Sequence, residues 1–64
     1  MTESDRYLLE SDGEIGGILV REGAQFIFHA SARWAWTLQD RRFPDLPAAQ
    51  RALDVQRREA NQAA

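Results

Sequence analysis

Apolar positions along this chain follow two different spacings. Through the first two thirds they alternate with polar positions or form short runs between Gly-containing turns, which is typical of β-strands. From Ala48 to Ala60 the chain contains no glycine or proline and is rich in good helix formers. The pattern predicts an α+β fold in which a three- or four-stranded antiparallel β-meander packs on one C-terminal α-helix.

Two dipeptides divide the strand region. Asp12-Gly13 lies between apolar runs and is a strong hairpin signal, and Glu22-Gly23 marks a second turn. They predict strands over residues 14–21 and 25–30, the second built on β-forming aromatic and branched residues. We expect the whole meander to occupy residues 7–39.

The remaining parts of the meander carry weaker signals. Tyr7 to Ser11 is predicted as a short edge strand that follows a loose terminus over residues 1–6. Trp34 to Gln39 is expected to form the last strand, after which residues 40–42 turn the chain. The pair Gly16-Gly17 predicts a bulge or sharp bend within its strand.

The start of the helix is the clearest boundary in the sequence. Asp45 can accept hydrogen bonds from the first unpaired backbone N–H groups, and Pro47 stands in the first turn, where a missing N–H costs nothing. The helix is predicted over residues 45–61. At 100° per residue, one face carries small and aliphatic residues, namely Leu46, Ala49, Leu53 and Ala60.

Alternation also assigns the faces of the predicted sheet. The aromatic side, with both tryptophans in the core, is expected to pack on the helix; it holds Phe26, Phe28, Trp34, Trp36 and Leu38. If Ile15 and Leu19 join that core, one helix leaves the opposite face uncovered. That face would hold Ile18, Val20, Ile27 and Ala35. Either residues 7–9 fold over this apolar patch, or it is a homodimer or partner interface.

Composition narrows the chemistry. The chain has 64 residues, which predicts one small domain over 1–64 with a thin core, and it has no cysteine and one histidine, His29. A catalytic role for His29 with Ser31 would need an orienting acid and an oxyanion hole that no spacing supplies. We therefore expect no enzyme activity, no metal and no cofactor. No apolar run nears the roughly 20 residues of a membrane span, so a cytoplasmic protein without membrane contact is predicted.

Charge is unevenly distributed although the net charge is only −2. Most acidic residues fall in the first third of the chain: Glu3, Asp5, Glu10, Asp12, Glu14 and Glu22. All eight basic residues are arginines, and most follow later: Arg33, Arg41, Arg42, Arg51, Arg57 and Arg58. This asymmetry predicts an electrostatically two-sided molecule, although arginine usage also follows from a GC-rich genome.

One family resemblance concerns the helix and the strands before it. Phe43, Leu46, Ala49 and Ala52 match the Phe-x-x-Leu-x-x-Ala-x-x-Ala helix start that follows a three-stranded meander in small DNA-binding modules of phage-type tyrosine integrases. The resemblance covers roughly residues 14–60. It implies a sheet packed on a helix. Those modules read the major groove with a basic sheet, whereas this chain has an acid-flanked strand and a negative net charge.

The leading functional hypothesis is a non-enzymatic protein-binding module. In size and acidity the chain is similar to small phage proteins such as anti-CRISPR inhibitors, some of which mimic DNA, and this similarity implies a partner that binds nucleic acid. The six acidic residues would then steer binding, and Ile18, Val20 and Ile27 would form the apolar contact. The alternatives are weak DNA or RNA binding through Arg33, Arg41, Arg42, Arg51 and Arg58, and a structural or assembly subunit.

Overall fold

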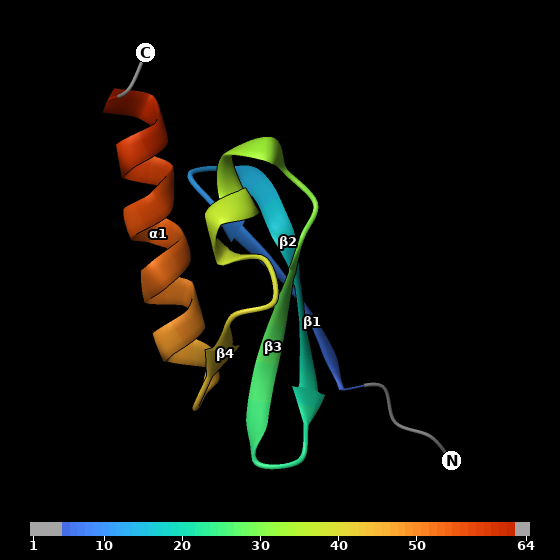
Figure 1. The fold of residues 1–64 in the computed structure, drawn as a ribbon. Helices are drawn as coiled ribbons and strands as arrows, with labels where there is room; N and C mark the ends of the chain where they lie inside the picture. Colours follow the sequence, from blue (N-terminus) through green and yellow to red (C-terminus); the bar gives the residue numbers. More distant parts are fainter. Residues whose placement is uncertain (1–4, 63–64) are drawn as a thin grey trace.

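A four-stranded antiparallel sheet in the order β1-β2-β3-β4 is covered on one face by a C-terminal helix (Figure 1). The computed structural model describes residues 5–62. Its elements are β1 (Arg6–Ser11), β2 (Glu14–Glu22), β3 (Gln25–Ala30), the 3₁₀ helix η1 (Arg33–Leu38), β4 (Arg42–Phe43) and α1 (Leu46–Gln62). The predicted α+β meander-plus-helix fold is confirmed.

Both predicted hairpin turns are present because their residues accept positive φ. Asp12 (φ 57°) and Gly13 (φ 81°) form the two-residue turn between β1 and β2, the geometry that favours Asp-Gly. Gly23 (φ 64°) opens the second turn, which consists of residues 23 and 24, one position later than predicted, because Glu22 still belongs to β2 and pairs with Gln25. The chain is thereby held in two tight hairpins.

The glycine pair produces the predicted bulge in β2. Leu9 pairs with Gly17 and Glu10 with Ile15, so Gly16 is the extra residue. A Cβ atom on Gly16 would lie 2.7 Å from Leu53 Cδ1 of α1. A Cβ atom on Gly17 would collide with the His29 carbonyl oxygen and the Phe28 ring. Glycine is required at Gly17, where the backbone of β3 approaches β2 so closely, whereas the neighbours of Gly16 are side-chain atoms.

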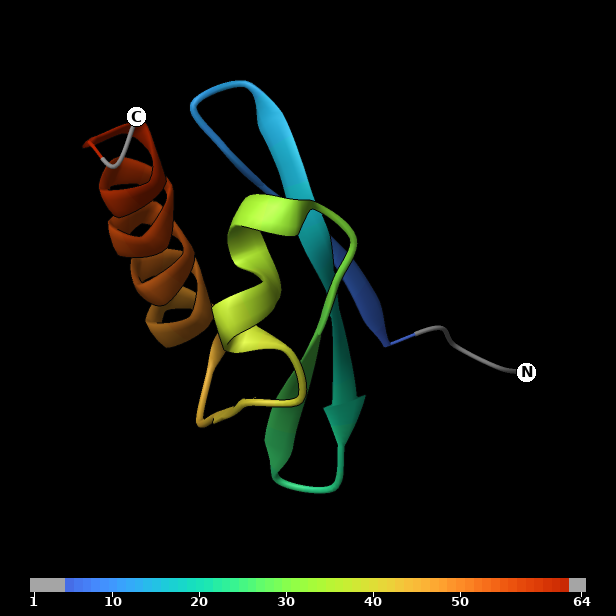
Figure 2. The same cartoon turned by 45° about the horizontal axis from the view of Figure 1, so that its top comes forward.

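The prediction of a strand over residues 34–39 is wrong, because this segment forms η1 beside α1 (Figure 2). The N–H groups of Ser31 and Ala32 both donate to the Gly16 carbonyl at 2.9 and 3.1 Å, which turns the chain away from the sheet. The two buried residues of η1, Ala35 and Leu38, are three apart, which is the period of a 3₁₀ helix.

Three side chains lie in an environment other than the predicted one, two because of η1 and one because of the bulge in β2. Trp36 is 56% exposed and Trp34 half-buried, so the prediction that both tryptophans belong to the core fails for Trp36. Ala35, expected on the uncovered face, is fully buried in the core. Ile15, considered for the core, is 46% exposed because the bulge at Gly16 reverses the alternation before it.

The core lies between the sheet and α1. Leu9, Leu19 and Phe28 reach it from the three long strands, while Ala49 and Leu53 come from the predicted face of α1. The other buried apolar residues lie on η1 and β4, and they are Ala35, Leu38 and Phe43.

The start of α1 is stabilised in the way that the sequence predicts. The Asp45 side chain accepts the Ala48 N–H at 2.9 Å, which satisfies one of the free donors of the first turn and confirms the predicted cap. The helix begins at the next residue, Leu46, and ends at Gln62, one residue later at each end than predicted.

The first strand begins one residue earlier than predicted. Residues 1–4 of the expected loose terminus lie outside the described residues. Arg6 already belongs to β1, and the Asp5 carbonyl accepts the Arg21 N–H at 2.9 Å. Tyr7 to Ser11 is the predicted edge strand, so this segment extends the sheet and does not fold over its uncovered face.

Candidate functional site

The face of the sheet that α1 does not cover carries a group of apolar side chains, which we call the open face. Leu8 is 58%, Ile15 46% and Ile18 37% exposed, while Val20 and Ile27 are half-buried. Ile18, Val20 and Ile27 lie here as predicted. Leu8 and Ile15 enlarge the group. Leu8 pairs with Ile18, and Ile15 pairs with Glu10, which shares the face of Leu8 by alternation along β1.

Strand pairing arranges all of these side chains except Ile15, which lies opposite Glu10, in two rows across the sheet. One row runs Leu8, Ile18, His29, and the neighbouring row runs Arg6, Val20, Ile27, Arg42. A shallow hollow of about 270 Å³ between the rows is lined by Arg6, Ile18, Val20 and His29. The open face is therefore a continuous surface, apolar in its middle and polar toward its ends.

Charges of both signs surround the open face. Alternation from Leu8 places Arg6 and Glu10 on it from β1, and alternation from Val20 places Glu22 on it from β2. Arg42 joins from β4, opposite Ile27. An apolar centre with a mixed polar rim is the usual composition of a protein-binding surface.

The acidic residues do not form one surface. Glu3 lies outside the described residues, and the others are all exposed. Glu10, Asp12 and Glu14 cluster at the β1–β2 turn, whereas Asp5 and Glu22 lie at the other end of β2. The two ends of a strand of this length are about 26 Å apart at roughly 3.3 Å per residue.

A polar contact network ties the β1–β2 hairpin to α1. Ser11 Oγ donates to Asp54 Oδ1 at 2.7 Å, and Gln50 Nε2 donates to the Glu10 carbonyl at 2.8 Å and to Asp54 at 3.0 Å. Sequence reasoning missed it, since the paired residues are about 40 positions apart and carry no local pattern.

Arg57 completes the attachment of the hairpin. Its guanidinium lies 2.8 Å from the Glu14 carboxylate and 4.9 Å from the centre of the Trp34 ring. Glu14, predicted to face a partner, is thus engaged within the molecule.

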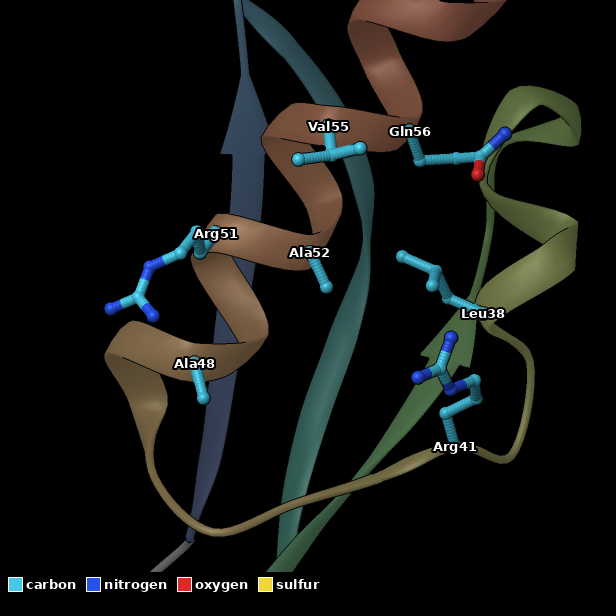
Figure 3. Close-up of a pocket in the computed structure, with 7 residues that line it drawn as sticks. All are labelled: Leu38, Arg41, Ala48, Arg51, Ala52, Val55 and Gln56. Carbon is cyan, nitrogen blue, oxygen red and sulfur yellow. The ribbon is translucent and has the colours of Figure 1, made fainter.

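The predicted arginines are exposed but scattered. Arg41 and Arg51 border the same groove of about 350 Å³, together with Leu38, Ala52 and Val55, yet the Arg51 guanidinium points away from it (Figure 3). The other three lie on different elements, Arg33 on η1, Arg42 on β4 and Arg58 on α1. They do not form the single basic stripe that groove binding uses.

The remaining chemistry in residues 5–62 is sparse. His29 is exposed on the open face and has no side-chain hydrogen bond to another described residue. No group of three histidine, cysteine or acidic side chains in this range could hold a metal ion. No helix in this range is long and apolar enough to cross a membrane.

Comparison of the chain with protein-family models, curated proteins and solved structures found no match. The resemblance to integrase DNA-binding modules therefore stays a prediction. The three long strands here are β1, β2 and β3, so the meander starts earlier in the chain than the resemblance assumed.

Proposed function

We propose that this chain is a non-enzymatic protein-binding module whose binding surface is the open face. The single observation that supports it is the group of exposed aliphatic residues, Leu8, Ile15 and Ile18, on a sheet face that α1 leaves uncovered. Leaving such side chains in water forgoes roughly 25 cal/mol per Å² of apolar surface, which a partner would recover by covering them.

The partner that this surface fits is a protein with an apolar patch and charges of both signs around it. The narrower hypothesis of an inhibitor that occupies a nucleic-acid-binding site requires carboxylates close together. Glu10 and Asp12 at the β1–β2 turn are the acidic residues that support it, since Glu14 contacts Arg57 and the remaining described acids of the first third lie at the far end of β2.

Site-specific photocrosslinking in the source cells tests the proposal. A photoreactive phenylalanine analogue at Ile18 should give a discrete crosslinked protein, and the same analogue at Arg58 on the exposed side of α1 should not. The partner so identified should bind the purified chain, and Ile18→Asp should weaken that binding at least tenfold while the far-UV spectrum is retained. Equal crosslinking at both positions, or unchanged binding by the folded variant, would contradict the proposal.

A further inference from the structure

The outer edge of β1 presents backbone groups that the sheet does not use. Because the Arg21 N–H donates to the Asp5 carbonyl, the β1 residues whose backbone N–H and C=O groups face β2 are Asp5, Tyr7 and Leu9. The N–H and C=O groups of Arg6 and Leu8 therefore point away from β2. At Glu10 the outward carbonyl accepts Gln50 Nε2 at 2.8 Å.

The opposite edge of the long strands is closed. The outward groups of Phe28 are paired, its N–H with the Arg41 carbonyl at 3.0 Å and its carbonyl with the Asp40 N–H at 2.8 Å. The Ala30 N–H donates to Gln39 Oε1 at 2.7 Å. β4, which forms the last edge, is only two residues long. Short, covered edges resist strand addition, so among residues 5–62 β1 is the edge open to it.

The side chains along β1 are complementary to themselves. Arg6, Leu8 and Glu10 are spaced by two and share the open face. If two copies pair β1 with β1 antiparallel about Leu8, each Arg6 faces Glu10 of the other copy, and the two Leu8 side chains face each other. Charge complementarity thus favours a second copy of this chain as the occupant.

We propose that two copies associate through antiparallel pairing of their β1 edges, centred on Leu8, to form one continuous eight-stranded sheet. In this register the two Leu8 residues exchange two backbone hydrogen bonds, and the backbone groups of each Arg6–Glu10 pair form further hydrogen bonds. A carbonyl oxygen accepts two hydrogen bonds, so the Gln50 contact to Glu10 is compatible with this pairing. The dimer joins the two open faces into one apolar stripe, and it does not depend on what that face binds.

Charge reversal provides a direct test by analytical ultracentrifugation of the whole chain. The unchanged chain should show a concentration-dependent monomer–dimer equilibrium. Arg6→Glu alone and Glu10→Arg alone each place like charges opposite one another and should weaken dimerisation about tenfold or more. An equimolar mixture of the two variants restores opposite-charge pairing and should dimerise again. Arg58→Glu and Glu59→Arg, both at exposed positions of α1, are the matched controls and should leave the equilibrium unchanged.

A monomer at every concentration up to about 1 mM would overturn the proposal, as would a dimer that the mixture does not restore. A covalent assay covers the case in which a reversal unfolds the chain. Because the chain has no cysteine, oxidised Leu8→Cys can form only an intermolecular disulfide. Facing residues of a hydrogen-bonded pair lie about 5.5 Å apart at Cα, which suits a disulfide. Leu8→Cys should crosslink at least tenfold faster than His29→Cys, and equal rates would overturn the proposed register.

Discussion

The two faces of the sheet differ although neighbouring residues of β2 supply both. Leu19 is fully buried in the core on the face that α1 and η1 cover, whereas Ile18, one position earlier, is 37% exposed on the open face. Both are aliphatic and similar in size, so composition does not distinguish them. What distinguishes them is that α1 covers only one side of the sheet.

This difference separates stability from recognition. Burial on the helix side supplies the stability of a small domain, which is of the order of 5 kcal/mol for a chain of this size. Apolar residues on the open face add little to that stability while they are exposed. Substitutions on the two faces should therefore have different consequences.

The largest expected effect is a loss of stability from a substitution on the covered face of the sheet, compared with the same kind of substitution on the open face. Leu19→Ala removes a fully buried side chain and should lower the free energy of unfolding by about 2–5 kcal/mol. Ile18→Ala, its neighbour on the open face, should lower it by less than about 1 kcal/mol. Urea denaturation followed by circular dichroism measures both. Equal losses would show that the open face is covered in solution.

A substitution at the bulge tests how closely the helix side is packed. Gly17→Ala places a Cβ against the His29 carbonyl and should cost about 1–3 kcal/mol, since backbone cannot easily move. Gly16→Ala meets the end of the Leu53 side chain and should cost less, because that side chain can rotate. The melting temperatures of the two variants rank them, and a larger loss for Gly16→Ala than for Gly17→Ala would be evidence against these contacts of the two glycines.

The helix cap offers a smaller change on the covered side. Asp45→Ala removes the acceptor of the Ala48 N–H and should lower the unfolding free energy by about 1 kcal/mol. Asp45→Asn keeps a side-chain oxygen at the same place and should lose less. Urea titrations of the two variants compare them, and an equally large loss for asparagine would argue against capping.

The smallest effect concerns the ion pair between hairpin and helix. Glu14→Gln removes the contact to Arg57, and because the Glu14 side chain is 56% exposed the loss should stay below about 1 kcal/mol. The difference from the unchanged chain should shrink further in 1 M salt. Glu22→Gln, outside this contact, serves as the control in the same denaturation series.

The elements that could be predicted from the sequence are those whose signals are local. Asp12-Gly13 specified its turn by its tolerance of positive φ, and Asp45 specified the helix start by its capping side chain. The placement of Ile18, Val20 and Ile27 on the uncovered face followed from alternation alone. Each of these depends on residues a few positions apart.

The errors arose where distant contacts decided the outcome. Alternation at Trp34, Trp36 and Leu38 indicated a strand, but hydrogen bonds to the Gly16 carbonyl diverted the chain into η1. The exposure of Ile15 depends on the register of β1 with β2, in which one extra residue between Ile15 and Ile18 reverses the alternation. The separation of the acidic residues likewise required the pairing of β1 with β2.

The glycine next to the bulge also affects how the chain finds its native strand pairing. Ile18, Leu19 and Val20 are apolar on both sides of β2, so a one-residue slip would exchange one aliphatic residue for another at the core. Hydrophobicity alone therefore discriminates poorly against a mispaired hairpin during folding. In the slip that moves Ile18 into the position of Gly17, its branched side chain would collide with the His29 carbonyl and the Phe28 ring. The absence of a side chain at Gly17 thus favours the native register of β2 over this mispaired one.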